Sequence, residues 1–261
     1  MPAVEYDVII HSLALVYPHA FNLFSRSCRY LNDILKPHAQ ACCAKWTRKK
    51  VLIEGDEKHY ATVLPNGLFT GEYVIVDTKI NKRTETKNYV NGILHGPYTK
   101  NKHRTDFLNR LYVSERTTAN YKDGKLNGLF TVWNHFSGKR YTATYLDGKL
   151  HGKETKYHLS GGVAEVTHYI HGVRHGTHKE FEMDGELTLE CEYKDDKLDG
   201  PYVEYKDRKR VVMAGYRKGE LHGTKMCFRP NGEISREEFW VQGGMDKCTK
   251  HPSTQKNKRR Y

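Results

Sequence analysis

The chain has 261 residues, of which only 38% are hydrophobic, and 43 Lys and Arg against 31 Asp and Glu give it a formal net charge of +12. A hydrophobic fraction this low excludes a deep globular core, whereas the regular placing of 22 glycines and 18 tyrosines excludes a disordered chain. The composition therefore predicts a thin, repetitive structure.

The cysteines and the N-terminal hydrophobic residues favour an intracellular protein. Six cysteines show no Cys-x-x-Cys spacing, and no secretory hydrophobic region with a cleavage site opens the chain. The apolar stretch from Val8 to Val16 is interrupted by His11 and Ser12 and is shorter than the roughly 20 residues that a membrane span needs. We expect neither a secretion signal nor a transmembrane segment.

Residues 1–50 are expected to form short amphipathic helices, because their apolar residues recur at helical spacing and Pro18 and Pro37 punctuate them. The apolar positions are Val8, Ile9, Leu13, Val16, Phe21, Leu23, Phe24, Leu31, Ile34 and Leu35. This segment differs in character from everything that follows it.

The same segment resembles a degenerate F-box. Met1-Pro2 and Glu5 stand in place of the family's Leu-Pro-x-Glu opening, and residues 27–31 stand where the family often has Val-Cys-Arg-x-Trp. The family's leucine, valine and tryptophan are absent at these places. The alternative is a helical cap that shields the exposed edge of the first hairpin.

The resemblance to an F-box implies a partner, a Skp-type adaptor subunit of a ubiquitin ligase. The residues that would bind it are Ile9, Ile10, Leu13 and Leu31.

A repeat with the frame Tyr-x-x-Gly-x-x-x-Gly occupies most of the remaining chain. Its second glycine falls at positions 71, 96, 128, 152, 176, 200 and 223, so successive copies are 23 to 25 residues apart except for one step of 32. We expect the extra residues of that step in a longer loop within 101–110. The repeat positions are Tyr89, Gly92, Gly96, Tyr121, Gly124, Gly128, Tyr145, Gly148, Gly152, Tyr169, Gly172, Gly176, Tyr193, Gly200, Tyr216, Gly219 and Gly223.

Each period holds a second turn signal, such as Ser137-Gly138 or Asp184-Gly185, nine or ten residues after the second glycine. Glycine reaches the positive φ that tight hairpin turns need. Two turns per period leave two strands, and the residues between the turns alternate in polarity. The repeat therefore predicts tandem β-hairpins.

One face of these hairpins is expected to be apolar. On the outgoing strand this face would carry the residues one, three and five positions after the second glycine, for example Leu129, Thr131 and Trp133. On the return strand it would carry Tyr141, Ala143 and Tyr145. Arg174 replaces a leucine and Asp196 a glycine of the repeat, so the middle of the array is expected to be its weakest part.

This repeat resembles the MORN repeat, in the variant with a Gly-Lys-Leu-His-Gly core as in residues 148–152. The resemblance covers roughly residues 60–245 and implies an open, twisted antiparallel β-sheet used for protein or lipid contact and for assembly. An F-box joined to this repeat variant resembles MORN-repeat-containing proteins of giant viruses. That resemblance implies a location in the host cytoplasm or nucleus.

Neither a metal site nor a catalytic site is predicted. His95, His151, His175 and His222 share one repeat position with Asn127 and Asp199, which indicates a polar residue suited to a turn. The sequence lacks a phosphate-binding glycine loop and the common hydrolase and kinase motifs. We therefore expect no cofactor and no enzymatic activity.

The last residues, 247–261, are expected to form a basic, disordered tail, since they contain Lys and Arg but neither Asp nor Glu. Such a tail is most often simply solvated; anionic lipid, nucleic acid or a nuclear import receptor are alternative partners.

The sequence thus predicts a mainly β protein: an elongated open antiparallel sheet of tandem hairpins at 51–246, with a small helical segment at 1–50. The expected function is non-enzymatic protein binding, as an F-box-like substrate adaptor of a ubiquitin ligase. The alternatives are a structural or assembly scaffold and a membrane-peripheral protein.

Overall fold

The computed structural model describes residues 47–64 and 67–252, and every regular element in this part is a β-strand. Consecutive strands pair in antiparallel fashion, which confirms the predicted mainly β class and the open sheet of hairpins. The predicted helices of residues 1–46 and the residues from 253 onward lie outside the described residues. In the described part no helix is long and apolar enough to cross a membrane.

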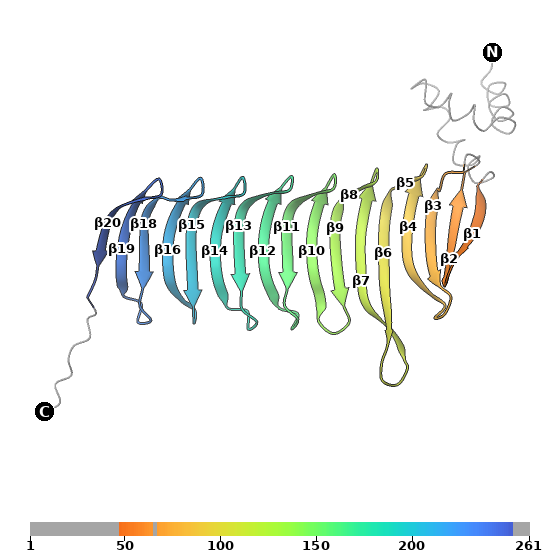
Figure 1. Ribbon diagram of the computed structural model, residues 1–261, viewed down its shortest axis with the longest axis horizontal. Helices are drawn as coiled ribbons and strands as arrows, with labels where there is room; N and C mark the ends of the chain where they lie inside the picture. Colours follow the sequence, from red (N-terminus) through yellow and green to blue (C-terminus); the bar gives the residue numbers. More distant parts are fainter. Residues whose placement is uncertain (1–46, 65–66, 253–261) are drawn as a thin grey trace, which may run out of the picture. The chain divides into compact units, whose positions relative to one another are not determined.

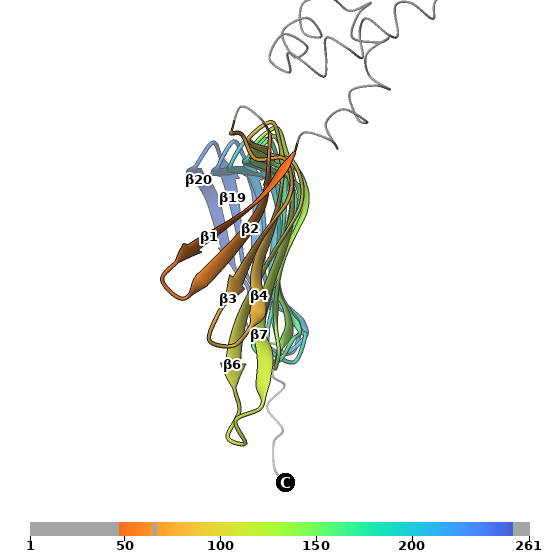
Figure 2. The ribbon, with the colours of Figure 1, turned by 90° about the vertical axis from the view of Figure 1, so that its right-hand side faces the viewer.

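The chain divides into two units, Met1–Asn101 with Tyr121–Gly124, and Lys102–Asn120 with Lys125–Tyr261. The described strands of the first unit are β1 (Arg48–Glu54), β2 (Glu57–Val63), β3 (Gly71–Asp77), β4 (Lys82–Val90), β5 (Ile93–Leu94) and the beginning of β6 (Gly96–Thr105). Strands β1 to β4 each pair with the next, and β4 pairs with both β5 and β6. The β1–β2 hairpin is turned away from β3 and β4 (Figure 2).

The second unit begins with the end of β6 and contains most of β7 (Leu111–Lys122). Its other strands follow one another side by side (Figure 1). They are β8 (Lys125–Leu126), β9 (Gly128–Asn134), β10 (Gly138–Leu146), β11 (Lys149–Tyr157), β12 (Val163–Ile170), β13 (Val173–Phe181), β14 (Leu187–Lys194), β15 (Lys197–Lys206), β16 (Lys209–Arg217), β17 (Glu220–Leu221), β18 (Gly223–Phe228), β19 (Ile234–Val241) and β20 (Gly244–Lys250).

The ends of the hairpin region differ from the predicted limits of 51 and 246. Strand β1 begins at Arg48, and β20 continues to Lys250, where it pairs with Arg236 of β19. Pairing with a neighbouring strand satisfies backbone groups whatever the side chains are, so the basic composition of 247–250 does not prevent a strand.

The long step of the repeat lengthens strands more than it lengthens a loop. The loop between β6 and β7 is confined to Asp106–Arg110, where the Asp106 carboxylate accepts hydrogen bonds from the backbone N–H groups of Leu108 and Arg110. Residues 101–105 of the range expected to form a loop therefore belong to strand β6, and residues 106–110 form the turn.

The two turn residues before each repeat core adopt the left-handed conformation predicted for them. Asp147 and Gly148 have φ of 49° and 82°, which defines a turn whose twist matches that of the flanking strands. Asp195 and Asp196, with φ of 52° and 63°, make the same turn without glycine.

The predicted side-chain orientation of the outgoing strands is wrong by one residue. Ala143 lies opposite Phe130, and Thr142 lies opposite Thr131, so Phe130 shares the face of Tyr141 and Ala143. Leu129 is 61% exposed on the other face. Register is set by the hairpin turns, and at positions of mixed polarity the hydrophobic pattern alone does not reveal it.

Candidate functional site

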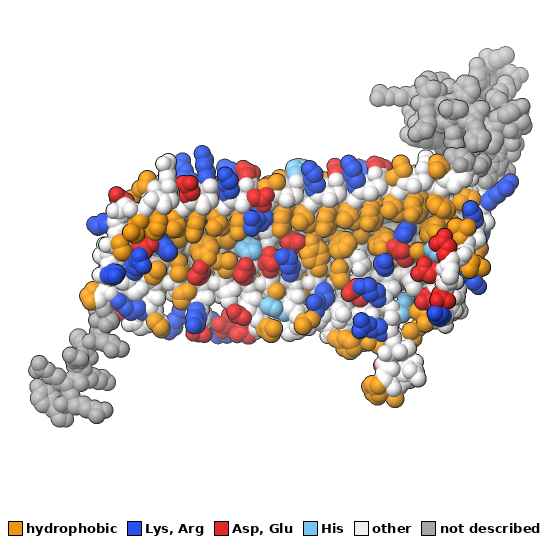
Figure 3. Space-filling model, in the orientation of Figure 1, with side chains coloured by type: hydrophobic (Ala, Val, Ile, Leu, Met, Phe, Trp, Pro, Cys, Tyr) orange, Lys and Arg blue, Asp and Glu red, His pale blue; other side chains and the backbone are white. Residues whose placement is uncertain are grey.

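A row of aromatic residues runs along one face of the second unit, at the end of the strands where the glycine turns lie. Each lies directly opposite a residue of the next strand, so that the paired side chains share one face. We call this set the tyrosine face: Tyr145, Tyr169, Tyr193, Tyr216 and Trp240, with their partners Leu150, Arg174, Leu198, Leu221 and Met245. Hydrophobic side chains form a band over these strands, and charged side chains interrupt this band at one place (Figure 3).

Tyr145, Tyr193 and Tyr216 each contact an aromatic ring of the preceding strand. The ring centroids of Phe130 and Tyr145 are 5.9 Å apart, and those of Tyr202 and Tyr216 are 5.5 Å apart. The contacts found here use the residue two positions after the second glycine, because that residue lies on the tyrosine face.

The two departures from the repeat, Arg174 and Asp196, bind each other. The Asp196 carboxylate accepts hydrogen bonds from the backbone N–H and the Nε of Arg174, at 3.0 and 3.2 Å. The Arg174 guanidinium lies 4.1 Å from the centroid of the Tyr193 ring, a cation–π contact. The two departures from the repeat thus pair with each other across neighbouring hairpins, and the weakness expected of this part of the array stays a prediction.

A row of buried polar residues, which was not predicted from the sequence, runs beside the tyrosines on the same face of the sheet. Glu154 is 6% exposed and accepts hydrogen bonds from the hydroxyls of Tyr141 and Tyr169. Burial and the nearby Glu154 charge raise the pKa of Tyr169 to about 12. Since hydrophobicity was the criterion, no signal in the sequence marked Glu154 as buried.

The buried row continues through His178, whose Nδ1 lies 2.8 Å from the Thr167 hydroxyl and whose Nε2 lies 3.1 Å from Glu180. Beside it, Cys191 is 1% exposed, and burial raises the pKa of its thiol to about 11. A thiol held neutral in this way is a weak nucleophile. The groups of this row bind one another and hold adjacent strands together.

The shared histidine position of the repeat serves the turns, as the sequence analysis interpreted it. His151 Nδ1 lies 3.4 Å from the backbone N–H of His171 in the turn of the following hairpin, and Asp199 accepts from Lys218 in the equivalent place. Among the described residues, no group of three or more His, Cys, Asp or Glu side chains could hold a metal ion.

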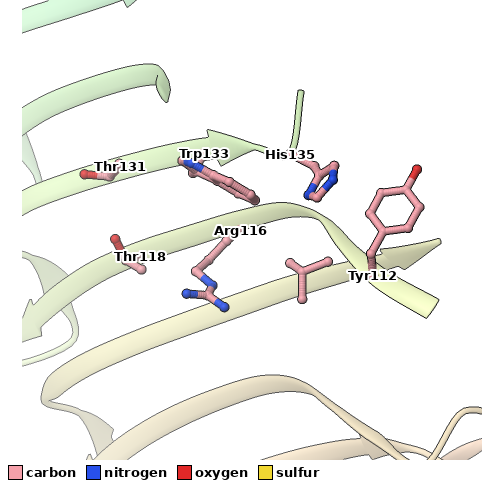
Figure 4. Close-up of a pocket in the computed structure, with 7 residues that line it drawn as sticks. Tyr112, Arg116, Thr118, Thr131, Trp133 and His135 are labelled. Carbon is pink, nitrogen blue, oxygen red and sulfur yellow. The ribbon is translucent and has the colours of Figure 1, made fainter. Parts of the chain in front are cut away.

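The opposite face carries a shallow pocket of about 390 Å³ between β7 and β9. Figure 4 shows Tyr112, Arg116 and Thr118 of β7 beside Thr131 and Trp133 of β9 and His135 at its end. The predicted row of aromatic residues five positions after the second glycine, which includes Trp133 and Tyr157, lies on this face and not on the tyrosine face.

The structure places the tyrosines and first glycines of the repeat near strand ends or in turns, whereas Gly152, Gly176 and Gly200 lie within β11, β13 and β15. The predicted adaptor-binding residues, Ile9, Ile10, Leu13 and Leu31, lie outside the described residues.

No protein-family model matches the chain, and no curated protein matches it. Among solved structures the chain is similar to a porin-like protein from Bacteroides uniformis, with 12% sequence identity and a TM-score of 0.19. The match covers 78% of this chain and 94% of that chain. A similarity this weak shows neither a common fold nor a common function.

Proposed function

We propose that the chain is a non-enzymatic, MORN-type repeat protein that binds another protein through the tyrosine face. The observation that carries this proposal is the hydrophobic band over consecutive strands of the second unit (Figure 3). Half-buried aromatic rings and leucines in a row, rimmed by charged turns, are the residue types that protein interfaces favour. An open sheet face of this kind takes an extended or helical segment of a partner.

For the N-terminal residues we keep the ligase-adaptor hypothesis. Ile9, Ile10, Leu13 and Leu31 would bind a Skp-type subunit, and the tyrosine face would hold the target, which raises the effective concentration of target near the ligase. The protein would then act inside a host cell, in the cytoplasm or the nucleus.

A pull-down from a eukaryotic lysate tests the adaptor hypothesis. We expect the full chain to recover a Skp-type subunit and a cullin, and the double variant Ile9→Asp/Leu13→Asp to lose both while it keeps the target. If neither form recovers a ligase subunit, residues 1–50 are a cap and the scaffold alternative stands.

The scaffold alternative uses the same face for self-association, and the membrane-peripheral alternative uses the basic surface on anionic lipid. Self-association predicts oligomers that persist after deletion of residues 1–50. Lipid binding predicts a steep loss of vesicle binding as salt is raised.

A further inference from the structure

The surroundings of Trp133 differ from those of the equivalent aromatic residues in the other repeats of the second unit. In each return strand, a register shift places two residues opposite the aromatic residue of the outgoing strand. These pairs are Val163-Ala164 opposite Tyr157, Leu187-Thr188 opposite Phe181, Arg210-Val211 opposite Tyr205, and Ile234-Ser235 opposite Phe228. Opposite Trp133 the pair is Lys139-Arg140, so both residues are cations, whereas each of the other pairs holds at most one.

A third cation lies on the other side of Trp133. Arg116 of β7 is its direct cross-strand partner and lines the same pocket. With neighbouring strands about 4.8 Å apart, these three cations span roughly 10 Å with the indole between them. The adjacent carboxylate of β7, Glu115, is on the opposite face and pairs with Lys102 at 2.6 Å.

Further aromatic rings lie beside Trp133 at the same end of the strands. His135 lies 6.0 Å from Trp133 and 4.7 Å from Tyr112, centroid to centroid, and Phe136 is 82% exposed beside them. The hydroxyls of Thr118 and Thr131 also line the pocket. Flat rings among cations and hydroxyls suit a ligand that has flat rings and anions in alternation.

We propose that this surface binds single-stranded nucleic acid: bases stack on Trp133 and its neighbouring rings, and phosphates lie against Arg116, Lys139 and Arg140. Base–aromatic stacking and a basic track for the backbone are the two components of such sites. The net charge of +12 complements an anionic polymer. An acidic peptide would use the cations but leave the exposed rings without a stacking partner.

The extra length of the repeat builds this site. The step of 32 residues lengthens β6 and β7, and Tyr112, near the start of β7, lies in the added part of the hairpin. The site is on the face opposite the tyrosine face, so nucleic acid and a protein target would not compete for it.

The test is the binding of a fluorescein-labelled nine-thymidine oligonucleotide to the full chain at low salt, followed by fluorescence anisotropy. We expect binding whose logarithm falls with the logarithm of salt concentration with a slope of about −2, as three phosphate contacts on a single strand predict. The variant Lys139→Ala/Arg140→Ala should bind at least tenfold more weakly and reduce the slope to about −0.7.

Two further variants separate the site from general charge and from misfolding. Lys125→Ala/Lys149→Ala removes the same charge from exposed positions at the other end of the strands and should change affinity less than threefold. Trp133→Leu keeps an apolar side chain but removes stacking, and should weaken binding about fivefold or more. All variants should keep the circular dichroism spectrum of the parent chain.

Three outcomes would overturn the proposal. These are an absence of binding by the parent chain, an equal loss of affinity in the two double variants, and displacement of the oligonucleotide by a nonaglutamate peptide at equal or lower concentration. The last outcome would assign the site to an acidic protein segment.

Discussion

At the scale of single residues, buried polar side chains beside the tyrosines connect neighbouring strands of the sheet. Glu154, Thr167 and His178 lie on three neighbouring strands and are almost fully buried. Their hydrogen bonds go to tyrosine hydroxyls, to one another and to Glu165 and Glu180, which avoids the cost of burying unpaired polar groups. In a single sheet with little hydrophobic cover, such a row fixes the register between strands.

Cys191 is predicted to resist alkylation in the folded protein, because burial both blocks access and raises the pKa of its thiol. Cys248, which is exposed on β20, serves as the internal control. Residue-resolved mass spectrometry after iodoacetamide treatment at pH 8 should show rapid modification of Cys248 and slow modification of Cys191. Equal rates for the two would contradict the buried position of Cys191.

The raised pKa of Tyr169 predicts a loss of stability in alkaline solution. Its folded-state pKa of about 12 lies above the unfolded value of about 10, so its contribution is complete below pH 10 and is lost as the pH rises toward 12. Urea unfolding between pH 9 and 11 should therefore show a shallower decline for Tyr169→Phe than for the parent chain. The matched control is Tyr60→Phe, at an exposed tyrosine; the same decline in parent and Tyr169→Phe would sink this account.

At the scale of the hairpin, the turns determine which face each side chain occupies. The turns and strands of the second unit follow from the repeat, because glycine and aspartate at positive φ leave a recognisable spacing. The facing of the outgoing strands does not follow from it, because Thr155 and Tyr157 alternate with the charged Glu154 and Lys156, and yet Glu154 lies on the face of Ala143. Glu154 illustrates the difficulty. This charged residue, two positions after the second glycine of its repeat, is buried, whereas Leu129, one position after the second glycine of another repeat, is exposed.

Alanine substitution separates turns that need glycine from turns that tolerate a side chain. Gly148 has a φ of 82°, so Gly148→Ala should lower the free energy of unfolding by about 1 to 3 kcal/mol. Gly162 lacks a positive φ, and an added Cβ there would meet nothing closer than 3.8 Å. Chemical denaturation should therefore show a small effect for Gly162→Ala, and similar losses in both variants would refute the turn assignment.

At the scale of the whole molecule, the described part offers two faces with different chemistry. The tyrosine face could have been predicted in part, because its tyrosines and leucines recur in the repeat. The cationic surface around Trp133 could not, because it depends on the register that places Arg116 on one side of Trp133 and Lys139-Arg140 on the other. The N-terminal residues that would bind a ligase subunit rest on their resemblance to an F-box alone.

The most direct test of the central claim is a comparison of protein partners captured by the full chain and by two matched variants. Leu150→Asp/Leu198→Asp changes the tyrosine face, and Leu129→Asp changes the opposite face at an exposed leucine. With all three proteins folded by circular dichroism, we expect the partner bound by the parent chain to be lost from the first variant and retained by the second. Retention of that partner by Leu150→Asp/Leu198→Asp would contradict the assignment of protein binding to the tyrosine face.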